Sequence, residues 1–125
     1  MRSSFDGRLY HATSRDKAEA FLRDGVPAHR SYWGVIEIAD YYAETVADEG
    51  HDSVILSAPL TAFDHALLME DTPGFEEPIS TVIGSTERLI HEAWSGTDRS
   101  WRSSLDTIGS VAYEGVLPAS ELRQE

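Results

Sequence analysis

The sequence contains no cysteine among its 125 residues. Disulfide bonds and thiolate-bound metal sites are therefore excluded, and this composition is compatible with a reducing compartment. No apolar run reaches the roughly 18 residues that a membrane-spanning helix needs. The N-terminal segment MRSSFDG lacks the apolar stretch of a signal peptide. We therefore expect a cytoplasmic protein that does not enter a membrane.

Basic residues are scarce. Ten Lys and Arg stand against 22 Asp and Glu, which gives a formal net charge of −12. Direct binding of nucleic acid is disfavoured, because phosphate contacts need Lys and Arg. The acidic surface has two interpretations. It is either an ordinary solvated exterior, or a surface that imitates nucleic acid and docks on a basic partner protein.

Several sequence motifs of known chemistry are also missing. No glycine-rich phosphate loop is present, which argues against dinucleotide-binding βαβ units and P-loop folds. The five histidines show neither H-x-H nor H-E-x-x-H spacing, so we expect no metal site. A G-x-S-x-G segment, which would position a serine nucleophile, is absent as well.

What the chain does have is enough apolar material for one core. Hydrophobic residues make up 41% of the sequence, and this length suits a single domain over residues 1–125. Residues 8–13 read as a strand, followed by a helix over 15–24 that Gly25 ends. We expect an extended segment over 32–34, a helix over 36–47 and a strand over 53–57.

The second half of the chain is less regular. Residues 71–74 have the chemistry of a turn, and an apolar stripe predicts a helix over 80–94. The Ser- and Arg-rich segment 96–104 predicts a loop. Residues 108–117 predict a long strand or a hairpin, and Pro118 precedes a terminal turn. Helices among short strands, with strands at both ends of the chain, predict an α+β fold with three to four helices.

The order of features in the first half carries a resemblance. A strand segment LYHATS (residues 9–14) precedes the helix that ends at Gly25. The aromatic-glycine segment Tyr32-Trp33-Gly34, the Ala- and Tyr-rich helix and the strand Val54-Ile55-Leu56 follow. Over about residues 8–60 this resembles the ADP-ribosyltransferase superfamily, in the branch of diphtheria toxin and the poly(ADP-ribose) polymerases. The small size, acidity and aromatic-glycine segment also resemble short phage anti-CRISPR proteins of that fold.

The resemblance implies a small split-sheet domain that binds NAD between two sheets and cleaves its nicotinamide–ribose bond. His11 matches the family's strand histidine, which binds a ribose hydroxyl, and Thr13 or Ser14 would assist. Tyr32 is the best match to the tyrosine that stacks on nicotinamide, with Tyr41 and Tyr42 as alternatives. The implied NAD-binding residues are therefore His11, Thr13, Ser14, Tyr32 and Tyr42.

The family also places an acid on a late strand. Glu114 in VAYEG (residues 111–115) is the first candidate for it, and Asp106 is the second. No E-x-E or Q-x-E motif is present to decide between them, so the catalytic set implied is His11 and Tyr32 with either Glu114 or Asp106.

Three functions are compatible with these features. The first is a mono-ADP-ribosyltransferase that uses NAD as substrate and modifies a target protein, as a phage-encoded inhibitor of a host defence complex would. The second is a non-catalytic acidic protein that blocks a nucleic-acid-binding partner by imitating the charge of nucleic acid. The third is a structural or immunity-type partner with no chemistry of its own.

Overall fold

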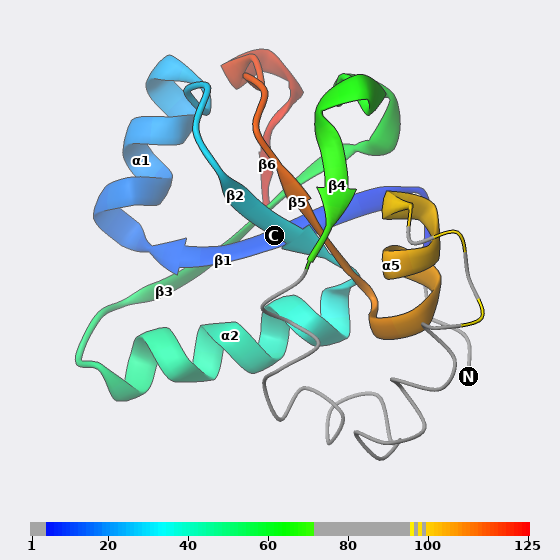
Figure 1. Cartoon of the computed structure of the whole chain (residues 1–125). Coiled ribbons are helices and arrows are strands. Elements are labelled where there is room, and N and C mark those ends of the chain that lie inside the picture. The colour runs from blue at the N-terminus through cyan, green and yellow to red at the C-terminus, as the bar shows by residue number, and fades with distance from the viewer. Residues whose placement is uncertain (1–4, 72–95, 97, 99) are drawn as a thin grey trace.

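In the part of the chain that the structure describes, the fold is an α+β arrangement with one twisted six-stranded antiparallel sheet and three α-helices around it (Figure 1). The computed structural model describes residues 5–71, 96, 98 and 100–125. The strand order is β4-β5-β2-β1-β3-β6. The strands are β1 (Arg8–Ser14), β2 (Ser31–Gly34), β3 (Ser53–Pro59), β4 (Leu68–Glu70), β5 (Ser110–Tyr113) and β6 (Arg123–Gln124). The helices are α1 (Arg15–Asp24), α2 (Ile36–Asp48) and α5 (Trp101–Ile108).

The sheet consists of two halves that meet at one point. β1 pairs with β3 along its whole length, from Arg8 opposite Pro59 to Ser14 opposite Ser53. β2 likewise pairs with β5 along all four of its residues. Between the halves, however, β1 and β2 share a single register pair, Tyr10 opposite Gly34. The sheet therefore opens between β1 and β2 beyond that pair.

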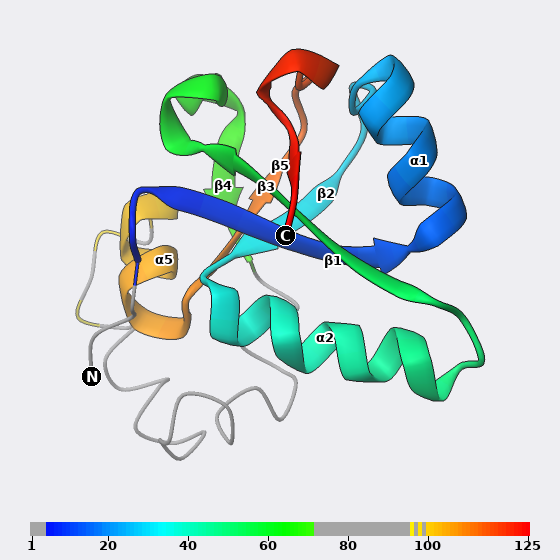
Figure 2. The ribbon, with the colours of Figure 1, turned by 180° about the vertical axis from the view of Figure 1, so that it is seen from behind.

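The helices pack where their apolar faces predict. α1 buries Ala18 and packs Phe21 and Leu22 against Val54 and Leu56 of β3. α2 buries Ile38 and Ala39 and contacts both β1 and β3. The two helices lie on opposite sides of these strands, as both views show (Figures 1 and 2). α5 lies against β4 and β5, at the other half of the sheet.

One glycine approaches its neighbours too closely for any other residue. Gly34 stands at the only β1–β2 register pair, and a Cβ atom there would lie 2.4 Å from the backbone oxygen of Gly109. The Tyr-Trp-Gly segment therefore ends in glycine because the turn after α5 passes directly over it.

Most of the elements predicted in the first half are confirmed. β1, α1, β2, α2 and β3 lie within one or two residues of their predicted bounds. Gly25 ends α1 with φ of +85°, a conformation that favours glycine. Ser14 occupies the position before the helix, but its side chain accepts no hydrogen bond from the first turn.

Two predictions in the second half are wrong in part. Residues 101–104, predicted as loop, form the first turn of α5. The Ser100 side chain accepts a hydrogen bond from Ser103 N–H, and Leu105 and Ile108 are buried. Neither the long strand nor the hairpin predicted over 108–117 forms: the only strand there is β5, which pairs with β2 and β4, because Ile108 ends the helix and Gly109 turns the chain with φ of +78°. The predicted helix over 80–94 and most of the turn over 71–74 lie outside the described residues.

Candidate functional site

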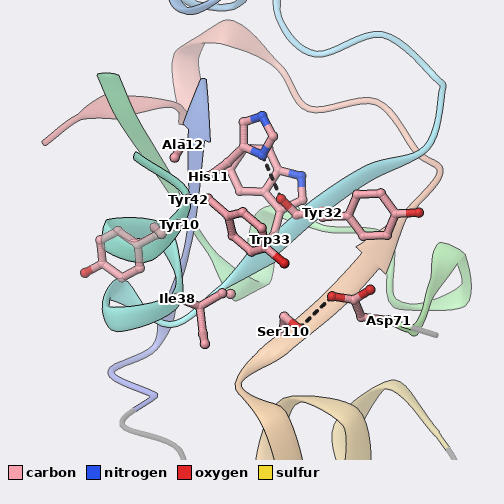
Figure 3. A pocket seen from close by; sticks show the side chains of 11 residues that line it. Tyr10, His11, Ala12, Tyr32, Trp33, Ile38, Tyr42, Asp71 and Ser110 are labelled. Carbon is pink, nitrogen blue, oxygen red and sulfur yellow. Dashed lines mark hydrogen bonds between the residues drawn. The ribbon is translucent and has the colours of Figure 1, made fainter. Parts of the chain in front are cut away.

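A cavity of about 250 Å³ lies where the sheet opens between β1 and β2. Its walls come from β1, β2, α2, the end of β4 and the start of β5 (Figure 3). Most of the side chains are aromatic or apolar. The lining residues that bear on function are His11, Tyr32, Trp33, Tyr42, Asp71 and Ser110.

His11 fills the opening between the two strands. If the β1–β2 register continued past Tyr10 and Gly34, Ala12 would lie opposite Tyr32. Instead, the His11 side chain reaches across, with Nδ1 2.7 Å from the backbone carbonyl oxygen of Tyr32 (Figure 3). The imidazole also lies 5.0 Å from the Trp33 ring, centroid to centroid. A side chain thus replaces the ladder hydrogen bond that is absent here.

This contact determines the protonation state of the imidazole. A carbonyl oxygen only accepts, so Nδ1 carries the hydrogen and donates it to Tyr32. Burial lowers the pKa of His11, and the hydrogen bond to Tyr32 opposes that effect only in part. The ring is therefore neutral at pH 7, and Nε2 on its other side is an acceptor. It can receive a hydrogen bond from a hydroxyl group of a ligand.

Tyr32 lies at the mouth of the cavity, with 37% of its surface exposed. Trp33, the next residue, points to the opposite face of β2 and is buried, with its indole N–H donating to Ser31 Oγ at 2.8 Å. Tyr42 comes from α2 and is half-buried at the cavity (Figure 3). The cavity therefore offers a partly exposed ring in Tyr32 and a second aromatic wall in Tyr42.

Glu114 lies at the rim beside Tyr32 rather than among the lining residues. Arg30 connects the two: its Nη2 lies 2.9 Å from Glu114 Oε1, and hydrogen bonds to Glu114 and then to Tyr32 raise the pKa of Arg30. Arg30 directly precedes Ser31 and Glu114 directly follows Tyr113, and Ser31 and Tyr113 form the last register pair of β2 and β5, so the ion pair lies at the end of these two strands. The structure thus places Glu114 next to Tyr32, held there by a half-exposed ion pair.

Other predicted site residues lie apart from the cavity. Asp106 is exposed on α5 and lines a separate groove of about 210 Å³ with Trp101. Thr13 is buried and Ser14 is half-buried, and neither lines the cavity. Tyr41, the other alternative to Tyr32, packs edge-on against Tyr42 and does not line the cavity either.

Sequence reasoning missed Asp71 and Ser110. Asp71 follows β4 directly and was assigned to a turn, whereas its side chain lines the cavity and only 3% of the residue is exposed. Ser110 opens β5 and donates from Oγ to Asp71 Oδ2 at 2.7 Å. An acidic residue directly after a short apolar strand was the available signal, but the sequence did not show which strand lies beside it.

The described part of the chain contains no group of three or more His, Asp or Glu side chains that could hold a metal ion. Nor does any helix within the described residues have the length and apolarity to cross a membrane. No family model matches the sequence, and neither a curated protein nor a solved structure matches it. The function therefore has to be inferred from the geometry of the site itself.

Proposed function

We propose that this protein is a mono-ADP-ribosyltransferase that transfers ADP-ribose from NAD to a target protein. The observation that carries the proposal is His11: it lies in the opening between β1 and β2, its Nδ1 donates to the Tyr32 carbonyl, and the residue is one of those that line an aromatic cavity. A sheet whose halves meet at one register pair also agrees with the split-sheet fold that the sequence resemblance implies.

The size of the cavity suits part of the dinucleotide. Sites for whole drug-sized ligands span roughly 300–1,000 Å³, and this one measures about 250 Å³. The nicotinamide ring and the ribose attached to it would enter, and the remainder of NAD would lie outside. Tyr32 would stack on the nicotinamide, and Nε2 of His11 would accept a hydrogen bond from a ribose hydroxyl.

The reaction follows from these placements. The bond between nicotinamide nitrogen and ribose C1′ breaks, and its electron pair goes to the nitrogen, which neutralises the pyridinium ring. The ribose becomes oxocarbenium-like, and a nucleophilic atom of the target bonds to C1′. The nucleophile's proton passes to a base. Glu114, at the rim beside Tyr32, is in the position to accept it and to stabilise the developing positive charge.

The sequence left Glu114 and Asp106 as candidates for the catalytic acid, and we therefore assign the role of base to Glu114. Asp106 lines a groove that, among the described residues, shares no lining residue with the cavity. The Arg30 ion pair is half-exposed, so the carboxylate can exchange this partner for a substrate group at modest cost.

The net charge bears on the target. At a formal charge of −12, the protein is attracted to basic surfaces, such as those of nucleic-acid-binding complexes. α2 contains no Lys or Arg and exposes acidic side chains at helical spacing, namely Glu37, Asp40, Glu44 and Asp48. This acidic helix also favours the second candidate function, a non-catalytic inhibitor that occupies the basic groove of such a partner.

The test compares the wild type with two variants that each remove one chemical function. His11→Asn keeps an N–H donor for the Tyr32 carbonyl but loses the Nε2 acceptor, and Glu114→Gln keeps shape but loses the base. We expect NAD at millimolar concentration to raise the Tm of the wild type and of Glu114→Gln, and to raise that of His11→Asn much less.

Transfer itself is measured by mass spectrometry of cellular proteins after expression, which detects added ADP-ribose. We expect modified targets with the wild type and a loss of about 100-fold or more with Glu114→Gln. If NAD does not change the Tm of the wild type and no modified protein is found, the proposed transferase activity is excluded. A target complex that forms without NAD and dissociates steeply with salt would then establish the inhibitor.

A further inference from the structure

The side chain of Glu114, the proposed base, already holds a guanidinium group. Arg30 Nη2 lies 2.9 Å from Glu114 Oε1, and Arg30 Nε lies 3.3 Å from the same oxygen. Both nitrogens belong to one planar group whose N–H bonds form a fixed fork, whereas the ammonium of lysine offers a single nitrogen. Within the described residues both contacts end on Oε1, which leaves Oε2 ready to take a proton.

The guanidinium of Arg30 also lies where the acceptor of the transfer has to lie. A general base must be within hydrogen-bond reach of the proton that it removes, about 2.6–3.2 Å between heavy atoms. Arg30 Nη2 meets this condition at Glu114. Hydrogen bonding to Tyr32 also contributes to the raised pKa of Arg30, so the same group contacts the side chain that would stack on nicotinamide. A guanidinium on Glu114 is therefore next to the reacting end of the proposed NAD site.

The exposure and charge of this ion pair allow one guanidinium to be exchanged for another. The side chains of Arg30 and Glu114 are 48% and 39% exposed. Ion pairs that water reaches contribute little to stability, so an arginine of another protein can displace Arg30 without unfolding the chain. An acidic acceptor, in contrast, would be repelled by the Glu114 carboxylate and by the net charge of −12.

We propose that the acceptor is an arginine side chain of the target protein, and that its guanidinium takes the place on Glu114 that Arg30 occupies in the free protein. The inference rests on the proposed function, since it names the acceptor of that reaction. A guanidinium nitrogen bonds to C1′ through its lone pair as the bond from C1′ to the nicotinamide nitrogen breaks. The electron pair of the broken bond leaves with nicotinamide, and one guanidinium proton passes to Glu114 Oε2. Arg30 competes with the acceptor for the carboxylate.

The experiment uses the whole protein, NAD and small acceptors of different chemistry. Agmatine carries a guanidinium group, cadaverine carries amines and N-acetylaspartate carries carboxylates. Mass spectrometry identifies the ADP-ribosylated acceptor. Released nicotinamide is measured separately, because it reports cleavage of NAD whatever the acceptor.

Two variants test the exchange of guanidinium groups. Arg30→Met removes the guanidinium from Glu114 and keeps an unbranched side chain. Arg102→Met is the matched control, because it makes the same change of charge at an exposed residue of the separate groove.

We expect the wild type to form ADP-ribosylated agmatine and no product with cadaverine or N-acetylaspartate. In Arg30→Met the KM for agmatine should fall about two- to fivefold with kcat unchanged, because the half-exposed ion pair no longer competes with the acceptor. Arg102→Met should keep both constants of the wild type.

Nicotinamide release without ADP-ribosylated agmatine, or with equal modification of cadaverine, would overturn the inference and leave the proposed function intact. This comparison needs only the wild type, so it holds even if a variant fails to fold. An equal KM for agmatine in the wild type and Arg30→Met would also overturn the inference, because the acceptor would then not use the place of Arg30. If no acceptor leads to nicotinamide release, the proposed function fails and the inference fails with it.

Discussion

His11 shows how one side chain can both hold a sheet together and prepare a site. Its Nδ1 hydrogen bond to the Tyr32 carbonyl closes the gap where β1 and β2 separate. The same bond leaves Nε2 as the acceptor. The imidazole therefore has a structural role through Nδ1 and a proposed binding role through Nε2. The two roles can be separated experimentally, because each depends on a different nitrogen.

The stability of the protein should depend on pH through His11. Burial lowers the pKa of His11 in the folded state, so the unfolded chain, with an ordinary value of 6.5, binds the proton more tightly. The stability that the neutral ring contributes is fully present above pH 6.5 and is lost as the pH falls through the folded-state pKa. Urea unfolding at pH 7.5, 6.5 and 5.5 should show the free energy of unfolding falling over this range.

His11→Asn is the control for that measurement. Asparagine does not titrate, and the other four histidines remain, so the difference between the two pH profiles isolates His11. The variant should lose less stability than the wild type between pH 7.5 and 5.5. Parallel profiles would contradict the assignment of a neutral imidazole whose pKa is lowered in the folded protein.

At the scale of elements, α1 ends where its chain crosses another segment. Gly25 has φ of +85°, and the next residue, Val26, forms an isolated bridge with Leu117. A Cβ on Gly25 would lie 2.5 Å from the Leu117 carbonyl oxygen. Glycine is therefore required at position 25 for two reasons: its φ is positive, and the Leu117 carbonyl oxygen leaves no room for a Cβ atom.

Gly25→Ala should destabilise the protein by about 2–4 kcal/mol, from the cost of a positive φ together with overpacking against backbone. Gly50 is the matched control, because its φ is +88° and nothing lies within 4 Å of a Cβ there. Gly50→Ala should cost about 1 kcal/mol. Urea denaturation measures both, and equal losses would mean that the contact with Leu117 contributes nothing.

The composition of the first turn led us to predict a loop where the structure has the start of α5. Its first turn, WRSS, looks like loop sequence, but Ser100 accepts a hydrogen bond from Ser103 N–H and Trp101 packs against the core. Apolar residues at positions 101, 105 and 108 follow helical spacing once that start is known. A capping residue, rather than the composition of the segment, marks where the helix begins.

At the scale of the whole molecule, the net charge of −12 acts against compactness. Like charges repel more in the folded protein than in the expanded chain, and salt screens this repulsion. The Tm should therefore rise between 20 mM and 500 mM NaCl, by about 4 °C for each kcal/mol of repulsion relieved.

The acidic face of α2 offers a control for the salt effect. The double variant Asp40→Asn/Glu44→Gln removes two exposed charges and should show a smaller rise in Tm over the same range of NaCl. Differential scanning calorimetry measures both proteins. A Tm that stays constant or falls with added salt would show that self-repulsion is not what limits the stability of this fold.

Local pattern in the sequence alone determined the early elements. Residues 8–14, 15–24 and 36–48 carry their own periodicity and stop signals, so they were predictable without knowledge of their neighbours. Two of these elements supplied His11 and Tyr42, and the short extended segment 32–34 supplied Tyr32, so three of the residues that meet at the cavity come from the predicted first half.

Only the tertiary structure decided how the site is completed. The opening between β1 and β2, the place of Glu114 beside Tyr32 through Arg30, and the pairing of Asp71 with Ser110 all join segments far apart in the chain. Such contacts depend on strand pairing and register, which local periodicity does not encode. That is why the sequence left the acid open between Glu114 and Asp106 and overlooked Asp71.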